Sequence, residues 1–153
     1  MTQFTNYLNF KKNIGRNILA IDYGEKVIGL ASFCPGKDPY PLVYGKIINK
    51  GLKRSLLELA QVIENDFFEI AIFGIPYLTD GSESKKTQEM KKLFSIFQTE
   101  FPKIEFISQD ETLTTFTAKE RMTSSPEFNF KVDMTKIDEV SAVIILEDYI
   151  RED

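Results

Sequence analysis

Histidine is absent from this 153-residue sequence, and cysteine occurs only once, at Cys34. A zinc site made of His or Cys ligands, a Ser-His-Asp triad and a Cys-His pair are therefore excluded within the chain. A single cysteine forms no internal disulfide, which is consistent with a reducing compartment. A bound metal would need oxygen ligands, which favours Mg²⁺ or Mn²⁺ held by carboxylates.

Long apolar runs are also lacking. The longest mainly apolar stretches, such as Val140 to Leu146, are far shorter than the ~20 residues needed to cross a bilayer. The N-terminus carries Asn and Lys where a secretion signal would place an apolar block. We therefore expect no membrane partner and a cytoplasmic location.

The sequence has no excess of positive charge, since its net charge is −4. A protein of this charge that binds nucleic acid needs a local basic patch. The hydrophobic share of 42% and the absence of repeats are typical of one compact domain with its own core.

The hydrophobic pattern predicts an α/β domain at residues 17–153, preceded by a flexible, loosely attached extension at 1–16. The order β-β-β-α-β-α-β-α-α predicts a mixed five-stranded sheet with helices on both faces. Asp80 and Glu83 have the spacing of a capping box for the second helix. Strands are expected at about 18–21, 27–33, 42–48, 69–75 and 104–108, and helices at about 51–66, 81–100, from the Asp110–Glu111 pair to 122, and 135–150.

Two acidic positions lie where predicted strands end. Asp22 follows the first strand and precedes a turn at Gly24, where the missing side chain keeps the approach open. The alternative is that Asp22 only forms an Asx-turn. Asp110 and Glu111 follow the last strand, and the alternative there is a helix cap, with Asp110 or Thr112 as N-cap and Glu111 in the first turn.

A third carboxylate, Asp138, shares the inner stripe of the last predicted helix with Ala142, Ile145 and Tyr149. Burying it is costly unless something compensates its charge; the alternative is an Asp solvated at the rim. Strand ends of one sheet and a helix laid across them would bring the three carboxylates together. They would repel one another and show raised pKa values unless a cation neutralised them. Such a cluster suits two-metal phosphoryl transfer.

Four ordered motifs resemble the YqgF (RuvX) family of Holliday junction resolvases, also described as pre-16S rRNA nucleases, within the ribonuclease H-like superfamily. The resemblance runs from about Ile18 to Tyr149. Its motifs are Asp22-Tyr23-Gly24-x-Lys26-x-Ile28-Gly29, then Gly74-x-Pro76 with Asp80-Gly81-Ser82-Glu83, then Asp110-Glu111-x-Leu113-Thr114-Thr115, and finally Asp138-x-x-Ser141-Ala142-x-x-Ile145-Leu146.

The resemblance implies that Asp22, Glu111 and Asp138 are a catalytic, metal-binding triad for Mg²⁺ or Mn²⁺. It also implies a loop beside the active site, made of Asp80, Gly81, Ser82 and Glu83. This sequence departs from the family at two positions: Thr112 and Val27 stand where Arg is usual. Two phosphate-contacting cations are therefore missing.

Other basic side chains must supply the contacts to nucleic acid if this interpretation holds, although each is also an ordinary solvated surface residue. The candidates are Lys26, Lys85, Lys86, Lys119, Arg121, Lys131 and Lys136.

Three hypotheses follow. The first is a metal-dependent nuclease for structured RNA or branched DNA; the resemblance favours 5′ maturation of pre-16S rRNA, with junction resolution as the alternative. The second is a non-catalytic RNA- or ribosome-associated module, motivated by the two missing arginines. The third is an ATP-binding module, because the actin and sugar-kinase fold also opens with a strand-Asp-x-Gly-strand hairpin. Either a monomer or a homodimer is compatible with the sequence; paired cuts in a junction favour the dimer.

Overall fold

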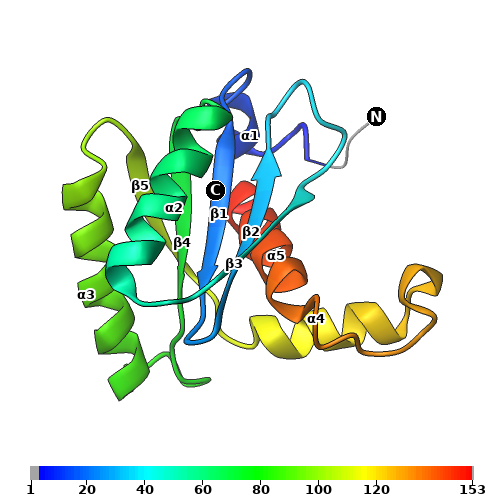
Figure 1. Cartoon of the computed structure of the whole chain (residues 1–153). Helices are drawn as coiled ribbons and strands as arrows, with labels where there is room; N and C mark the ends of the chain where they lie inside the picture. Colours follow the sequence, from blue (N-terminus) through cyan, green and yellow to red (C-terminus); the bar gives the residue numbers. More distant parts are fainter. Residues whose placement is uncertain (1–3, 153) are drawn as a thin grey trace.

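A computed structural model describes residues 4–152 and contains one five-stranded sheet in the order β3-β2-β1-β4-β5 (Figure 1). The pairs β1–β2 and β2–β3 are antiparallel, whereas β1–β4 and β4–β5 are parallel. The expected mixed α/β sheet is therefore confirmed. The strands are β1 (Ile18–Tyr23), β2 (Val27–Phe33), β3 (Leu42–Ile48), β4 (Ile70–Ile75) and β5 (Glu105–Asp110).

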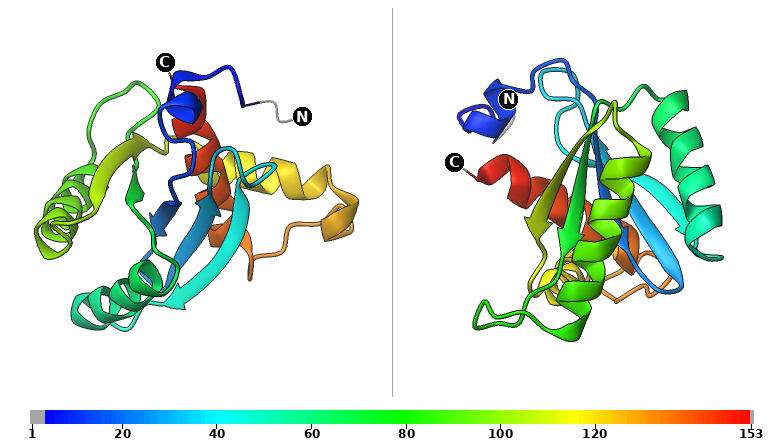
Figure 2. Two further views of the ribbon diagram at one scale, coloured as in Figure 1. Left: turned by 90° about the horizontal axis from the view of Figure 1, so that it is seen from above. Right: turned by 90° about the vertical axis from the view of Figure 1, so that its left-hand side faces the viewer.

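Helices cover both faces of the sheet (Figures 1 and 2). Side chains alternate along each strand, so Leu19 and Ile21 of β1 enter the core beneath α2 and α3, whereas Ile18 and Ala20 pack against α5. The helices are α1 (Leu8–Lys11), α2 (Leu52–Asn65), α3 (Lys85–Glu100), α4 (Thr114–Thr123) and α5 (Ile137–Arg151), with a 3₁₀ turn, η1 (Pro126–Phe128).

Helix α5 lies directly on β2 because Gly29 has no side chain. A Cβ atom at this position would be only 2.0 Å from the backbone oxygen of Asp138. The close approach places the first turn of α5 over the β1–β2 hairpin. It thereby carries Asp138 to the end of β1.

The N-terminal segment is packed onto the domain, in contrast to the expected loose extension; residues 1–3 of that extension lie outside the described range. Phe4 and Phe10 are buried in the same core cluster as α5. Asn9 Nδ2 donates to the backbone oxygen of Tyr149 at 2.7 Å, and Asn13 Nδ2 donates to the Tyr149 hydroxyl at 3.1 Å. Isolated aromatic anchors without helical or strand periodicity carry this packing, so the hydrophobic pattern did not indicate it.

Helix α3 begins at Lys85, four residues later than expected, because its cap is Ser84. The Ser84 hydroxyl accepts from the Thr87 backbone N–H at 3.2 Å, and Thr87 Oγ1 accepts from the Ser84 N–H at 3.0 Å. The capping box predicted for Asp80 and Glu83 is therefore wrong. Asp80 instead accepts from the backbone N–H and hydroxyl of Ser82 at 2.9 and 2.6 Å.

Helix α4 also starts later than the acidic pair that precedes it. Its N-cap residue is Leu113, in the left-handed region with φ 62°, and makes no side-chain cap. Asp110 and Thr112 are therefore not caps of this helix; Asp110 accepts from the Thr112 N–H at 2.7 Å. No helix within residues 4–152 combines the length and apolar character needed to span a bilayer.

Candidate active site

The site lies at the edge where the parallel strands end. Strands β1, β4 and β5 run in the same direction, and Gly74 pairs with Gln109 while Ile75 pairs with Asp110. Because carboxyl ends of parallel strands meet at one edge, Asp22 and Glu111 emerge side by side. The Glu111 N–H donates to the Ile75 oxygen at 3.0 Å, which fixes the start of its segment to β4.

Asp22 and Glu111 are in direct contact through a hydrogen bond between their carboxyl groups. Burial raises the pKa of Glu111, and the adjacent Asp22 charge raises it further. Burial and the charge of Asp138 also raise the pKa of Asp22, although the hydrogen bond from Glu111 opposes that rise. Without a cation, the pair therefore holds one proton on Glu111, which donates it to Asp22.

Gly74 makes room for Glu111. A Cβ at position 74 would lie 2.9 Å from Glu111 Oε2 and 2.6 Å from Ile145 Cδ1. Both separations are shorter than ordinary contacts between side-chain atoms, so any larger residue would displace the Glu111 carboxylate or the Ile145 side chain. Gly74 was noted in the sequence only as part of a motif, and its spatial role depends on the packing of Ile145.

Asp138 lies beside the pair in the first turn of α5. Its Oδ1 is 3.8 Å from where a Cβ would stand on Gly24, and its charge acts on Asp22. Burial raises the pKa of Asp138, while Lys46 opposes the rise. Within residues 4–152, no three His, Cys, Asp or Glu side chains converge into a ready-made metal site. The structure therefore joins two members of the expected triad and holds the third nearby.

The side chains present suit a hard divalent cation. Every donor at this edge is a carboxylate oxygen, as Mg²⁺ and Mn²⁺ prefer. Two buried carboxyl groups in contact need either a proton or a cation between them. The Asp22–Glu111 contact is where a cation would replace that proton, and Asp138 is the adjacent oxygen donor.

Two lysines compensate part of the negative charge. Lys86, in the first turn of α3, lowers the pKa values of both Asp22 and Glu111, and its Nζ is 3.8 Å from Glu25 Oε1. Lys46, on β3, acts on Asp138 and donates to the Thr135 oxygen at 2.7 Å. The sequence interpretation included Lys86 but missed Lys46. Strand β3 lies far from α5 in the sequence, and no local pattern links them.

Arg121 is exposed but already forms an ion pair within the chain. Its guanidinium donates two hydrogen bonds to Glu147 of α5, at 2.7 and 3.1 Å. Its expected contact with nucleic acid would compete with this ion pair. The other basic candidates outside the carboxylate edge are exposed: Lys26 in the β1–β2 turn, Lys85 on α3, Lys119 on α4, Lys131 after η1 and Lys136 before α5.

The predicted loop beside the active site forms a compact turn. Gly81 has φ 86°, and its N–H donates to the Leu78 oxygen at 2.8 Å; the Leu78 N–H donates to the Ser82 oxygen at 2.9 Å. Glu83 forms an ion pair with Lys91.

The base of this turn reaches the Glu111 segment through the Thr112 hydroxyl, which donates to the Tyr77 oxygen at 3.4 Å. The turn therefore borders the carboxylate edge.

Several known proteins are similar to this chain. A protein of Thermus thermophilus named "Putative pre-16S rRNA nuclease" is 31% identical over 133 residues, which cover 86% of this chain and 94% of that protein. A protein of Flavobacterium psychrophilum with the same name is 28% identical over 134 residues, covering 87% of this chain and 95% of its own.

Solved structures of junction resolvases share the fold. Thermus thermophilus RuvC in complex with a Holliday junction substrate has a TM-score of 0.57 at 12% identity, covering 89% of this chain and 95% of that one. The fowlpox virus Holliday junction resolvase has a TM-score of 0.55 at 13% identity, covering 88% and 96%. The family described as "RuvX: Holliday junction resolvase" matches residues 16–152. With this match over nearly the whole chain, the protein belongs to the RuvX family of nucleases.

Proposed function

We propose that this protein is a divalent-metal-dependent nuclease that hydrolyses phosphodiesters, acting in the 5′ maturation of pre-16S rRNA in the cytoplasm. The observation that carries the proposal is the buried contact between Asp22 and Glu111 at the carboxyl edge of the sheet. A structural role alone does not account for two carboxyl groups placed in contact where burial disfavours the charge of both. The names of the similar proteins support rRNA as the substrate.

Asp22, Glu111 and Asp138 would hold Mg²⁺ or Mn²⁺. In a two-metal site the cations position the attacking water and stabilise charge on the leaving oxygen. The chain's own contribution is to orient the carboxylates: Gly74 leaves space for Glu111, and Gly29 lets α5 bring Asp138 close. Lys86 and Lys46 provide positive charge next to these acids, where a phosphodiester would lie.

Contacts to the rest of the nucleic acid fall to the exposed basic residues around this edge. Lys26 and Lys136 lie within four residues of Asp22 and Asp138 in the sequence, Lys85 precedes Lys86, and all three lysines, Lys26, Lys85 and Lys136, are exposed. Thr112 stands where the family usually has Arg, and its side chain is tied to Asp110 at 2.5 Å and to Tyr77. It therefore adds no cation, and Lys86 and Lys46 take on a larger share of phosphate binding.

Junction resolution is a second candidate, because the fold is shared with solved Holliday junction resolvases. Resolution requires paired cuts and therefore a homodimer. A third candidate, a catalytically weak RNA- or ribosome-associated module, is favoured by the two absent arginines. All three candidates would use the same surface to bind nucleic acid. They differ in whether the nucleic acid is cleaved and in whether it is rRNA or a DNA junction.

A cleavage assay separates them. Purified protein is incubated with a 5′-extended 16S rRNA fragment or a four-way DNA junction, in Mg²⁺, Mn²⁺ or EDTA. We expect cleavage of the rRNA fragment with either metal, none in EDTA, and none by Asp22→Asn at unchanged circular dichroism. Glu64→Gln, an exposed change on α2, is the matched control and should cleave normally.

Cleavage in EDTA, or normal cleavage by Asp22→Asn, would overturn the proposal. Symmetric cutting of the junction without rRNA cleavage would select the resolvase. Binding of RNA with no cleavage in either metal would select the inactive module.

A further inference from the structure

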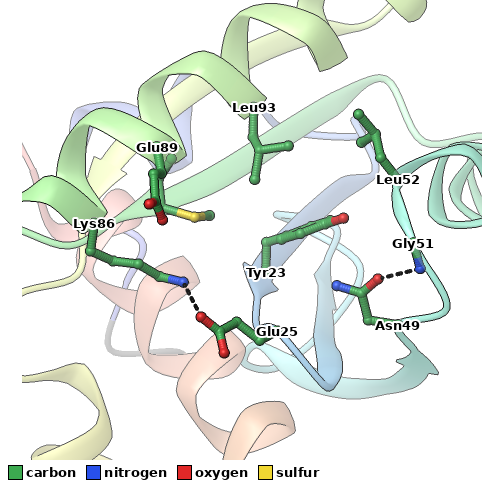
Figure 3. Close-up of a pocket in the computed structure, with 9 residues that line it drawn as sticks. Tyr23, Glu25, Asn49, Gly51, Leu52, Lys86, Glu89 and Leu93 are labelled. Carbon is green, nitrogen blue, oxygen red and sulfur yellow. Dashed lines mark hydrogen bonds and ion pairs between the residues drawn. The ribbon is translucent and has the colours of Figure 1, made fainter.

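A cavity of about 360 Å³ lies between the start of α2 and the N-terminal half of α3 (Figure 3). It opens on the face of the sheet opposite to Asp22, since Tyr23 belongs to the core cluster under α2 and α3. Its size falls within the ~300–1,000 Å³ typical of small-molecule sites. Its apolar walls come from Leu52, Met90 and Leu93, and its polar groups from Tyr23, Glu25 and Glu89.

Tyr23 presents its hydroxyl to this cavity. The residue is 9% exposed, and its ring is held by Phe73 and Phe97, with centroids 6.2 and 5.5 Å away. Its hydroxyl has no hydrogen-bond partner within residues 4–152, and Figure 3 shows it directed towards Leu52. This oxygen is not one of the fully buried polar atoms that lack a partner, so it is reachable from the cavity, and a ligand there could bond to it.

The start of α2 adds further donors beside the Tyr23 hydroxyl. Gly51, the N-cap residue, provides no side-chain cap for the helix. Its own N–H donates to Asn49 Oδ1 at 3.0 Å, and Asn49 Nδ2 donates to the Gly24 oxygen at 2.8 Å. Asn49 thus fixes this wall to the β1–β2 turn, and the first-turn N–H groups of α2 remain available.

The charges at the rim favour a neutral ligand over a phosphate. Glu25 and Glu89 bring two carboxylates, against one ammonium group from Lys86 (Figure 3). Apolar walls with carboxylate acceptors at the edge suit an apolar-faced group that carries N–H donors, as a nucleobase does. Lys86 lines the cavity and its charge also acts on Asp22 and Glu111, so this side chain links the cavity to the carboxylate pair on the other face of the sheet.

We propose that this cavity is a nucleobase subsite that takes one unstacked base of the substrate strand, next to the phosphodiester held at Asp22 and Glu111. The base lies between Leu52 and Leu93 and bonds to the Tyr23 hydroxyl and the rim carboxylates. Bases with an exocyclic amine, such as cytosine and adenine, bind better than uracil. This inference rests on the proposed function and specifies its substrate as a strand with an unpaired nucleotide beside the cut.

Binding of mononucleotides to the full chain, in EDTA, tests the cavity without relying on cleavage. The probes are cytidine 5′-monophosphate, uridine 5′-monophosphate and ribose 5-phosphate. Their binding is measured by NMR titration. Leu93→Trp fills the cavity; Ile96→Trp, about one turn further along α3 and 38% exposed, is the matched control. We expect the cytidine nucleotide to bind wild type and Ile96→Trp alike, and Leu93→Trp about tenfold more weakly or worse.

Four results would overturn the subsite: no binding of the cytidine nucleotide to wild type, equal binding to Leu93→Trp, equal binding of ribose 5-phosphate, or uridine nucleotide binding as tight as cytidine. Tyr23→Phe keeps the ring and removes only the hydroxyl, so it tests the same claim if Leu93→Trp fails to fold. We expect severalfold weaker binding of the cytidine nucleotide, and unchanged affinity would overturn the assignment.

Different results would contradict the nucleobase subsite and the proposed nuclease function. If wild type cleaves no nucleic acid in Mg²⁺ or Mn²⁺ but loses base binding in Leu93→Trp, the cavity stands and the nuclease proposal falls. If cleavage is metal-dependent and Leu93→Trp cleaves with unchanged KM, the nuclease proposal stands and the subsite falls.

Discussion

At the scale of single residues, the contact between Asp22 and Glu111 lowers the stability of the metal-free protein at high pH, but it places two carboxylates where they could bind a cation. Burial, with the charge of Asp138, raises the pKa of Asp22 to about 6, and burial, with the charge of Asp22, raises the pKa of Glu111 to about 9. Both values lie above those of an unfolded chain, so the protonated forms are favoured by folding. The stabilisation is complete below about pH 4 and is lost as the pH rises through the two folded pKa values.

Asp22→Asn removes one of these charges, and we expect it to stabilise the metal-free protein at high pH. At pH 8 the gain in unfolding free energy should be on the order of 1–3 kcal/mol, and it should shrink towards zero near pH 4. Urea denaturation in EDTA at both pH values measures it, with Glu64→Gln as control. A variant less stable than wild type at pH 8 would show that the carboxyl contact is not strained.

At the scale of elements, helix α4 is attached to α5 by a small apolar cluster that includes Ala118 and Met122, and by one ion pair at its edge. Arg121 donates two hydrogen bonds to Glu147, a residue only 9% exposed. Because α4 otherwise projects beyond the sheet (Figure 1), this pair has a structural role in addition to any contact with nucleic acid. Removing the guanidinium would leave the Glu147 carboxylate buried without its main partner.

Arg121→Ala is therefore expected to lower the unfolding free energy by about 1–3 kcal/mol. Lys119→Ala, an exposed change on the same helix, should cost less than about 0.5 kcal/mol. Thermal melts of both variants provide the comparison. If Arg121→Ala leaves stability unchanged but weakens nucleic-acid binding, the arginine acts on the substrate instead.

Most of the element order follows from the sequence, because apolar runs and amphipathic spacing reflect which faces are buried. The meeting of Asp22 and Glu111 follows as well, since both end strands of one sheet. Helix starts were less predictable: Asp80-x-x-Glu83 and Ser84-x-x-Thr87 have the same spacing, and the tertiary bond from Thr87 to the Pro76 oxygen favours the second. The contacts of Lys46 and Gly74 depend on packing between distant segments.

At the scale of the whole molecule, the N-terminal segment completes the core behind α5. Phe10 is 5% exposed and contacts Phe33, with ring centroids 6.0 Å apart. Removing such a ring usually costs 3–5 kcal/mol through lost burial and a residual cavity, and we expect Phe10→Ala to cost about 3 kcal/mol.

Leu8→Ala, on the same short helix and 56% exposed, is the matched control for Phe10→Ala and should be nearly neutral in the same melts. Equal stabilities of the two variants would indicate that the N-terminal segment is only loosely attached, and would contradict this prediction.

The central claim is that a divalent cation replaces the proton shared by Asp22 and Glu111. Calorimetric titration of Mn²⁺ near pH 7.5, in two buffers of different ionisation enthalpy, measures binding and proton release together. We expect release of about one proton per bound ion and much weaker binding by Asp22→Asn and Glu111→Gln. Equal Mn²⁺ affinity in both variants, or binding without proton release, would contradict it.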